Sequence, residues 1–492
     1  MENCVRYASV FEAIPQHIRT VLENFVRIVH HDHIRIKSRS WYLFFKFVKA
    51  VRQHVGDVAE QVIGAISDLL PIKAPAPDDD KDEDMSSDEQ DNSEAALFSK
   101  QLYLFQAVGY LSSSPSIPAE KQALYVRTIM GDLFADMEQH LPLAESGNVQ
   151  ALNQIDHLVL ALGTVAQGFS EGMPAAPSSA GSGRRQTPEK VVADEFARAA
   201  EAILVALSQF NTSLNIRTAC RSAFSRLLGI LGGNMLPQLP QWIDGLLSAS
   251  SGKDEMAFFL RILHQVVFEF KGEIYDVLDQ LFTPLQQRLF MALNEPIMGT
   301  DDQVQLGELR REYISFILAI LSNNLEGTLV SDRNQACFEQ VIACVMELAR
   351  SFESSTSSSK VAFGILTRMA TIWGGPDVGG TGAAPSPAIP QFDQFMVDRF
   401  HALCWEVISD PSFRLGDAQS RQILTEIGTL EATIWAKTGE LMMHNLRMSN
   451  SEGARALLLA LQEGPTKARI VAFFSTNKNL TAARPNNRAN KQ

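Results

Sequence analysis

The feature that most constrains the fold is a helical spacing of apolar residues along nearly the whole chain. At about 100° per residue, the apolar side chains of residues 38–51 fall on one broad face of a helix. They are Trp41, Leu43, Phe44, Phe45, Phe47, Val48 and Val51. No segment shows the alternation of period two that is typical of a half-buried strand. The sequence therefore predicts an all-α protein.

The predicted helices come in pairs, and a pair recurs about every 40 to 50 residues, which is the spacing of HEAT and armadillo hairpins. Asn215 is expected to cap one of these helices, with Arg217 near its start. We therefore expect an α-solenoid of stacked HEAT-like helix hairpins that forms a curved superhelix with a concave wall. The further helices are predicted over residues 102–111, 119–133, 152–169, 191–210, 216–231, 256–270, 274–293, 308–321, 336–352, 360–373, 392–408, 418–437 and 453–461.

Three polar or Gly/Pro-rich stretches divide the 492 residues, and one of them dominates the net charge of −13. Residues 74–94 contain ten acidic residues and one basic residue, so the rest of the chain is close to neutral. Such a composition favours disorder. The predicted organisation is HEAT-like helices with a basic strip (1–73), an acidic disordered linker (74–94), HEAT-like helices (95–171), a Gly/Ser/Pro linker (172–188), HEAT-like helices (189–373), a Gly/Pro linker (374–390), C-terminal HEAT-like helices (391–475) and a basic disordered tail (476–492).

No group of residues has the spacing of a catalytic, cofactor or metal site. Cys337 and Cys344 lie two helical turns apart without a further ligand nearby, so they are interpreted as core residues. The histidines of residues 30–33 are neighbours in sequence and are interpreted as a solvated loop or helix end. We therefore expect no enzyme, no catalytic residue, no cofactor and no metal. No stretch is long and apolar enough to predict a membrane span.

Basic residues are the more informative pattern. Residues 27–52 contain seven of them against one acid, Asp32. On a helix, Arg39, Lys46 and Lys49 lie within about 80° of each other, opposite the apolar face. Such a stripe suits a phosphate backbone, but it also suits an ordinary solvent-exposed face, and both interpretations stay open. The doublet Arg310-Arg311 lies beside acidic residues and is expected to form a solvated, salt-bridged face.

Several segments, taken in order, resemble the exportin-T family, the tRNA exportins of the importin-β superfamily. They are residues 38–49 (SRSWYLFFKFVK), 117–124 (IPAEKQAL), 309–313 (LRREY), 372–377 (IWGGPD), 417–419 (DAQ) and 467–469 (KAR) leading into Phe473-Phe474. The low-complexity linkers suggest a fungal member. The resemblance covers the C-terminal half of the family's chain, so we expect a fragment, a truncated gene model or a short isoform.

The resemblance implies a nuclear export carrier that wraps tRNA by shape and phosphate contacts and shuttles between nucleus and cytoplasm. It implies three partners: tRNA, GTP-bound Ran GTPase (mainly through an N-terminal half absent here) and nuclear-pore proteins. The alternative is a solenoid scaffold that binds Ran or nucleoporins without contacting RNA. The candidate tRNA-binding residues are Arg35, Lys37, Arg39, Lys46, Lys49, Arg52, Lys467, Arg469, Lys478 and Arg484.

Overall fold

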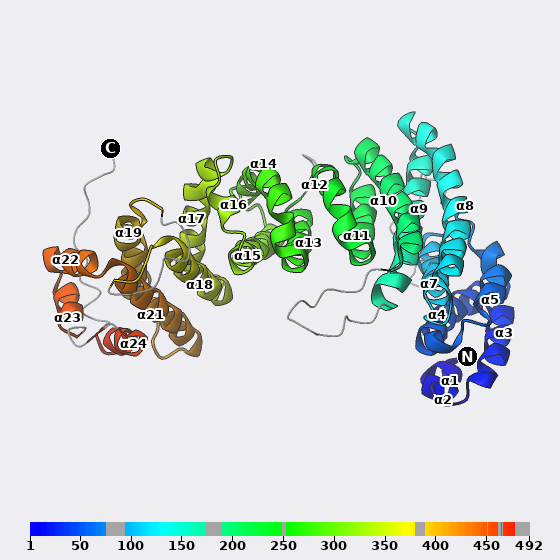
Figure 1. Cartoon of the computed structure of the whole chain (residues 1–492), viewed down its shortest axis with the longest axis horizontal. Coiled ribbons are helices and arrows are strands. Elements are labelled where there is room, and N and C mark those ends of the chain that lie inside the picture. Colours follow the sequence, from blue (N-terminus) through cyan, green and yellow to red (C-terminus); the bar gives the residue numbers. More distant parts are fainter. Residues whose placement is uncertain are drawn as a thin grey trace. The chain divides into compact units, whose positions relative to one another are not determined.

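The computed structural model describes residues 1–74, 94–172, 188–247, 252–378, 389–449, 451–460, 464 and 466–477 (Figure 1). Within these ranges the regular elements are helices and no strand occurs, so the predicted fold class is confirmed. The chain divides into two compact units, residues 1–251 and residues 252–492. Each unit is described by itself. None of the helices in the described ranges combines the length and the apolar character needed to cross a bilayer.

The first unit contains eleven α-helices among its described residues, joined by short turns. They are α1 (Glu2–Arg6), α2 (Ala8–Ala13), α3 (Ile18–Val29), α4 (Ile34–Val51), α5 (Ala59–Ile66), α7 (Glu94–Ser112), α8 (Ala119–Glu145), α9 (Val149–Gly172), α10 (Lys190–Phe210), α11 (Leu214–Leu231) and α12 (Leu239–Leu246).

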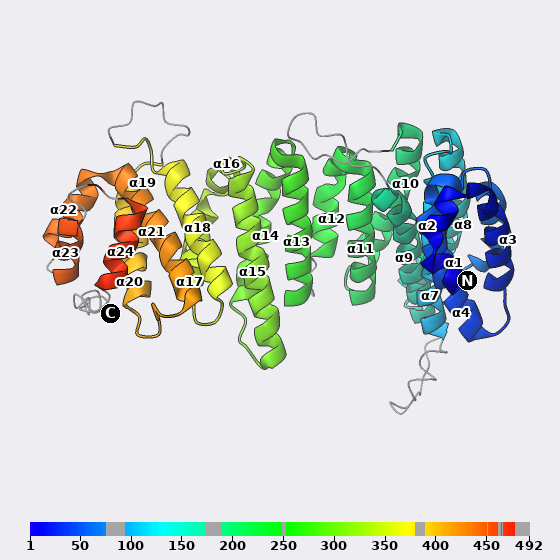
Figure 2. The same cartoon turned by 90° about the horizontal axis from the view of Figure 1, so that it is seen from below.

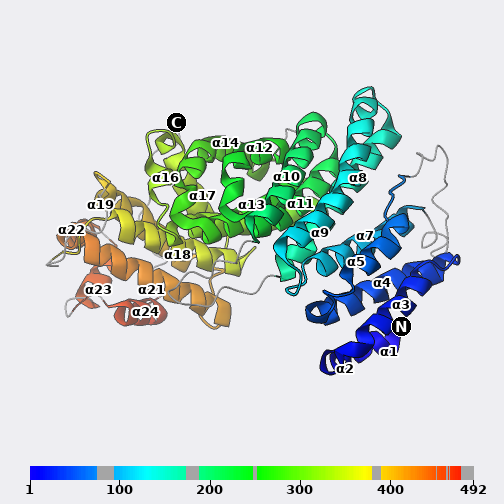
Figure 3. The same ribbon diagram turned by 45° about the vertical axis from the view of Figure 1, so that its right-hand side comes forward.

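Most helices of the first unit form two layers (Figure 3). One layer runs from α4 through α7 and α9 to α11, each helix packing on the next. The other layer includes α8, α10 and α12, which also pack in sequence. Large aromatic side chains fill the space between neighbours, and Phe44, Phe105, Phe169 and Phe224 are completely buried. Because each hairpin buries its apolar surface on the next, the helices stack as expected for a solenoid.

Helices α7 and α9 cross unusually closely at two glycines. A methyl group at Gly168 would lie 2.2 Å from the carbonyl carbon of Gly109, and one at Gly109 would lie 2.5 Å from the carbonyl oxygen of Val165. Real side-chain carbons do not approach so closely, so only glycine fits at this crossing. The close approach brings Tyr110, the residue after Gly109, beside the last turn of α9.

The second unit repeats the layered arrangement (Figure 2). Helices α13, α15, α18, α21 and α24 pack successively against one another, while α14, α16, α17 and α20 lie between them in the chain. The described helices are α13 (Lys253–Phe270), α14 (Tyr275–Leu293), α15 (Thr300–Ser322), α16 (Gly327–Val330), α17 (Gln335–Arg350), α18 (Thr356–Trp373), α19 (Phe392–Phe395), α20 (Ala402–Ser409), α21 (Ala418–Thr438), α22 (Glu440–Met448), α23 (Glu452–Ala460) and α24 (Lys467–Thr476).

Two local predictions need correction. Asn215 is not a cap, because α11 begins at Leu214 with Ser213 in the capping position. Arg217 is 2% exposed and donates a hydrogen bond to the carbonyl oxygen of Asn211 at 2.7 Å, which satisfies a group of the preceding helix end. The helix predicted over residues 392–408 contains a π-helical turn at Met396–His401, which apolar spacing alone does not reveal.

Candidate nucleic-acid interface

Helix α4 carries the basic residues, and its apolar face fixes how they are presented. Its aromatic side chains pack against α3, where the rings of Phe25 and Phe47 stack with centroids 5.1 Å apart. The indole N–H of Trp41 donates to the carbonyl oxygen of Val29 at 3.1 Å. These buried contacts fix which side of α4 faces the core, so the opposite side of the helix faces solvent.

Arg39, Lys46 and Lys49 are exposed on that opposite face, as the helical spacing predicts. We call these three residues the α4 strip. Arg39 donates to the carboxylate of Glu2 in α1 at 2.8 Å, but both side chains are more than half exposed. An ion pair so exposed to water contributes little to stability and breaks readily. The cationic ends of Arg39 and Lys46 also lie 5.5 and 5.6 Å from the ring centroid of Tyr42.

Of the ion pairs made by the α4 strip, the one formed by Lys49 is the less exposed to water. Its ammonium group lies 2.7 Å from the carboxylate of Glu171 at the end of α9, and its Nζ lies 5.1 Å from the ring centroid of Tyr110. Partial burial raises the pKa of Glu171, but hydrogen bonds from Lys49, Tyr110 and Gln167 outweigh it and lower the pKa to about 2. Glu171 is therefore ionised at neutral pH and neutralises part of the local charge.

Two further arginines lie near Tyr110 and Glu171. Arg52 lies in the 3-10 turn after α4, and its Nε donates to the Ser113 hydroxyl at 3.2 Å. Arg226 of α11 donates to the hydroxyl of Thr164 at 3.1 Å. Burial lowers the pKa of both guanidinium groups. Arg52 is half-buried and so departs from the exposed strip in which it was predicted, and no pattern in the sequence selects Arg226.

The start of α4 adds to the positive surface. Arg35 is exposed in the first turn, and the ammonium group of Lys37 lies 5.5 Å from the ring centroid of Trp41. The first turn carries no acidic residue, so the positive end of the helix dipole is not neutralised there. Together with Arg39, Lys46 and Lys49 in the α4 strip, these residues give α4 five basic and no acidic side chains.

The histidines before α4 lie at a helix end, as predicted. His30 follows α3, and its ring contacts the carbonyl oxygen of Val26 at 2.7 Å and the carboxylate of Asp68 at 3.1 Å. Burial alone would lower the pKa of His30, but these two contacts outweigh the effect of burial and raise the pKa. Across the described ranges, no three side chains of the metal-ligating types gather at one point.

The C-terminal candidates belong to the second unit. Lys467 is exposed at the start of α24, where Thr466 caps the helix by accepting a hydrogen bond from the backbone N–H of Arg469. The Arg469 guanidinium donates to the carbonyl oxygen of Gly464 at 3.2 Å. Lys478 and Arg484 lie outside the described residues.

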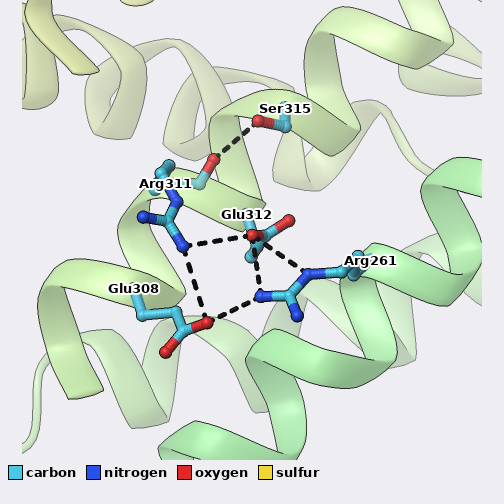
Figure 4. A network of polar contacts seen from close by, with 5 residues as sticks. All are labelled: Arg261, Glu308, Arg311, Glu312 and Ser315. Atoms are coloured by element: carbon cyan, nitrogen blue, oxygen red, sulfur yellow. Dashed lines mark hydrogen bonds and ion pairs between the residues drawn. The ribbon is translucent and has the colours of Figure 1, made fainter. Parts of the chain in front are cut away.

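A second basic cluster lies at the doublet Arg310-Arg311, and Figure 4 shows the different environment of Arg311. Arg311 lies 3.5 Å from the carboxylates of both Glu308 and Glu312 on its own helix. Arg261 of α13 approaches the same two carboxylates at 2.6 and 3.1 Å. The predicted salt-bridged face is confirmed, and Arg261 is the partner that the sequence did not identify. We call Arg261, Glu308, Arg311 and Glu312 the α13–α15 network.

Comparison with known proteins identifies the family. The Exportin-T family model matches residues 1–457. A protein named Exportin-T from Neurospora crassa is 52% identical over 486 residues, which cover 96% of this chain and 47% of the relative. The protein of that name from Pyricularia oryzae is 55% identical over 459 residues, covering 91% of this chain and 44% of the relative. The chain belongs to the Exportin-T family.

The chain spans about half the length of the curated relatives that it matches. Its similarity to fungal members agrees with the origin expected from its linkers. The chain is also similar to one in a solved structure titled for Kap95p binding to RanGDP, with a TM-score of 0.38 and 13% identity over 97% of this chain and 60% of the other.

Proposed function

We propose that this chain is the tRNA-contacting part of a nuclear export carrier. The observation that supports this most directly is the charge of α4, which presents five basic and no acidic side chains from one helix. Each phosphate that is neutralised by such a side chain releases a condensed counterion, and this release favours binding of any RNA backbone of matching shape. Because the chain belongs to the Exportin-T family, we infer that the bound RNA is tRNA.

The proposed contact residues are those predicted from the sequence. Arg35, Lys37 and the α4 strip form the first set, and the exposed pair between Arg39 and Glu2 is weak enough for a phosphate to replace the carboxylate. Arg52 supports this surface from its edge. Lys467, Arg469, Lys478 and Arg484 form the second set. Arg261 and Arg311 are not included, because carboxylates already surround them.

The rest of the carrier cycle is part of the same proposal. GTP-bound Ran binds mainly through the part of the relatives that this chain does not match. The loaded complex passes the pore by contacting nuclear-pore proteins, so the carrier shuttles between nucleus and cytoplasm. It acts as a carrier without catalysing a reaction.

A second candidate function, a protein-binding scaffold without RNA contact, rests on a different observation. Four apolar side chains are more than half exposed around the connection between α14 and α15: Met291, Ile297, Met298 and Val304. Apolar side chains gathered on a surface are typical of protein contacts. Binding through them responds little to salt, whereas phosphate contacts respond strongly.

The test is a titration of the 492-residue chain with mature tRNA at low and physiological salt, with and without GTP-bound Ran. The proposal predicts binding without Ran, and a log–log salt slope of about −0.7 to −0.9 for each phosphate contact. Binding that does not change with salt, or no binding in any condition, contradicts direct RNA contact by this chain. In that case the scaffold interpretation is favoured.

A further inference from the structure

We propose that a pocket between α4 and α7 binds one unpaired nucleotide, with its base against two tyrosines and its phosphate between two cations. This inference rests on the proposed RNA binding and adds a site and a ligand class to it. The pocket has a volume of about 260 Å³ and is open to solvent. Its lining residues are Ser38, Arg39, Tyr42, Lys100 and Tyr103.

The two aromatic rings form a corner. The ring centroids of Tyr42 and Tyr103 lie 5.1 Å apart, and the ring planes meet at 70°. The ring of Tyr103 is held from behind, because it stacks on the buried ring of Phe45 with centroids 5.6 Å apart. A planar base that stacks on one tyrosine therefore turns its edge toward the face of the other, an arrangement that aromatic groups favour. Every base has such a face, so the corner accepts bases without reading sequence.

Two of the lining residues, Arg39 and Lys100, are cations. Arg39 lines the pocket, and its pair with Glu2 is exposed to water on both sides. Lys100 lines the pocket from α7 and forms no ion pair within the described ranges. None of the described residues that line the pocket is acidic, and the Glu2 carboxylate, 2.8 Å from Arg39, is the group that a phosphate would replace there. A guanidinium and an ammonium group together suit a phosphate, which accepts charge-assisted hydrogen bonds.

Polar atoms are available for the edge of the base or for the ribose. The hydroxyl groups of Tyr42 and Tyr103 have no hydrogen-bond partner among the described residues. The hydroxyl of Ser38 donates to the carbonyl oxygen of Arg35 at 3.3 Å and can still accept. Two steeply inclined rings, two cations and three hydroxyl groups match the base, phosphate and ribose of one nucleotide. Because Arg39 also belongs to the α4 strip, the pocket continues the surface that is proposed to contact the RNA backbone.

The test uses a six-nucleotide unstructured RNA that carries 2-aminopurine, whose fluorescence is quenched when it stacks on an aromatic ring. The full chain is titrated with this RNA, and Tyr103→Leu is compared with its matched control Tyr103→Phe. The proposal predicts quenching with the unsubstituted chain, and about tenfold weaker binding with no quenching for Tyr103→Leu. Tyr103→Phe keeps the ring and loses one hydroxyl, so it should still quench and bind only about twofold to threefold more weakly. Tyr42→Leu, on the solvent side of α4, gives the same loss as Tyr103→Leu without disturbing the contact between Tyr103 and Phe45.

Any of the following results overturns the proposal. If the hexamer binds without quenching, or binds Tyr103→Leu and Tyr42→Leu as tightly as the unsubstituted chain, the pocket does not stack a base. If a phosphotyrosine peptide displaces the hexamer at a lower concentration than tRNA does, the pocket serves a protein ligand instead. When tRNA binds with strong salt dependence but the hexamer does not bind, only this inference fails. When neither RNA binds, the proposed function fails with it.

Discussion

The α4 strip of the first unit and the α13–α15 network of the second unit both place basic side chains on the solvent side of a long helix. They differ in the acids that surround them. In the α13–α15 network two arginines meet two glutamates within 3.5 Å, so the charges cancel locally. Around the α4 strip, Lys49 meets the carboxylate of Glu171, and Arg39 meets that of Glu2 in a pair that is more than half exposed on both sides. Lys46 forms no ion pair among the described residues. The comparison teaches that the number of basic residues in a segment matters less than the acids that the fold brings to it.

The largest expected effect comes from reversing the charge of the α4 strip. The triple variant Arg39→Glu, Lys46→Glu and Lys49→Glu should bind tRNA about two orders of magnitude more weakly, because it loses attraction and gains repulsion. Its helix content should not change, since these side chains lie away from the core. Circular dichroism and a filter-binding titration measure the two quantities.

The matched control reverses three exposed charges of the second unit, with Lys360→Glu, Arg368→Glu and Arg421→Glu. The net charge changes by the same amount, but tRNA affinity should fall much less, because the α4 strip is intact. Equal losses in the two triple variants would show that total charge and not the α4 strip governs binding.

The next largest effect concerns the crossing that brings Tyr110 to Glu171. Gly168→Ala places a methyl group 2.2 Å from Gly109 and should lower the free energy of unfolding of the first unit by about 1 to 3 kcal/mol. Gly131→Ala in α8 meets no atom within 4 Å and should raise it by about 0.5 to 1 kcal/mol. Urea unfolding measures both variants. Equal stabilities would contradict the close approach of α7 and α9.

A smaller effect is expected in the α13–α15 network. Arg261→Gln leaves Glu308 and Glu312 with Arg311 as their cation and should cost the second unit about 1 kcal/mol, less at high salt. Arg368→Gln, which changes an exposed arginine of α18 with no ion pair among the described residues, serves as the control and should cost nothing measurable. Neither variant should change tRNA affinity. A loss of tRNA binding in Arg261→Gln would show that RNA contacts the α13–α15 network. It would contradict the difference between this network and the α4 strip.

The smallest effect comes from Glu171, the carboxylate that reduces the charge of the first region. Glu171→Gln should raise tRNA affinity about twofold to threefold, because Lys49 loses its counter-charge. Glu145→Gln, an exposed change on α8, controls for total charge and should have a weaker effect. Fluorescence anisotropy at low salt resolves these differences.

The same variant makes a prediction about pH. The pKa of Glu171 is about 2 in the folded chain and about 4.5 when unfolded, so the carboxylate contributes stability that is fully present above pH 4.5. That contribution is lost as pH falls toward 2, because the unfolded state takes up the proton first. Stability measured from pH 5 to pH 2 should therefore fall less steeply in Glu171→Gln. Equal slopes would contradict the ion pair with Lys49.

The fold could be predicted from the sequence to the extent that it depends on spacing within one helix. Apolar periodicity identified α4 and the exposed position of Arg39, Lys46 and Lys49, because both follow from the turn of a single helix. It did not identify the π-helical turn at Met396–His401. Such a turn holds one more residue than an α-helical turn, and the types of residue in it do not reveal this.

The site could be predicted only in part, for a related reason. Arg311 and Glu308 are three positions apart on one helix, so their contact follows from the sequence. Lys49 and Glu171 are separated by 122 positions, and Arg226 reaches Thr164 across 62. Such pairs depend on which helices become neighbours. The pattern of basic residues in the sequence therefore gives candidate RNA contacts. Which acidic side chains surround them can be known only from the fold.

The central claim is that RNA contacts α4 and not the α13–α15 network. Ultraviolet cross-linking of the full chain to tRNA, followed by mass spectrometry of the attached peptides, tests it most directly. The account predicts cross-links within residues 34–51 that disappear in the triple α4 variant, and none at Arg261 or Arg311. Cross-links at Arg261 and Arg311, with residues 34–51 unmodified, would contradict it.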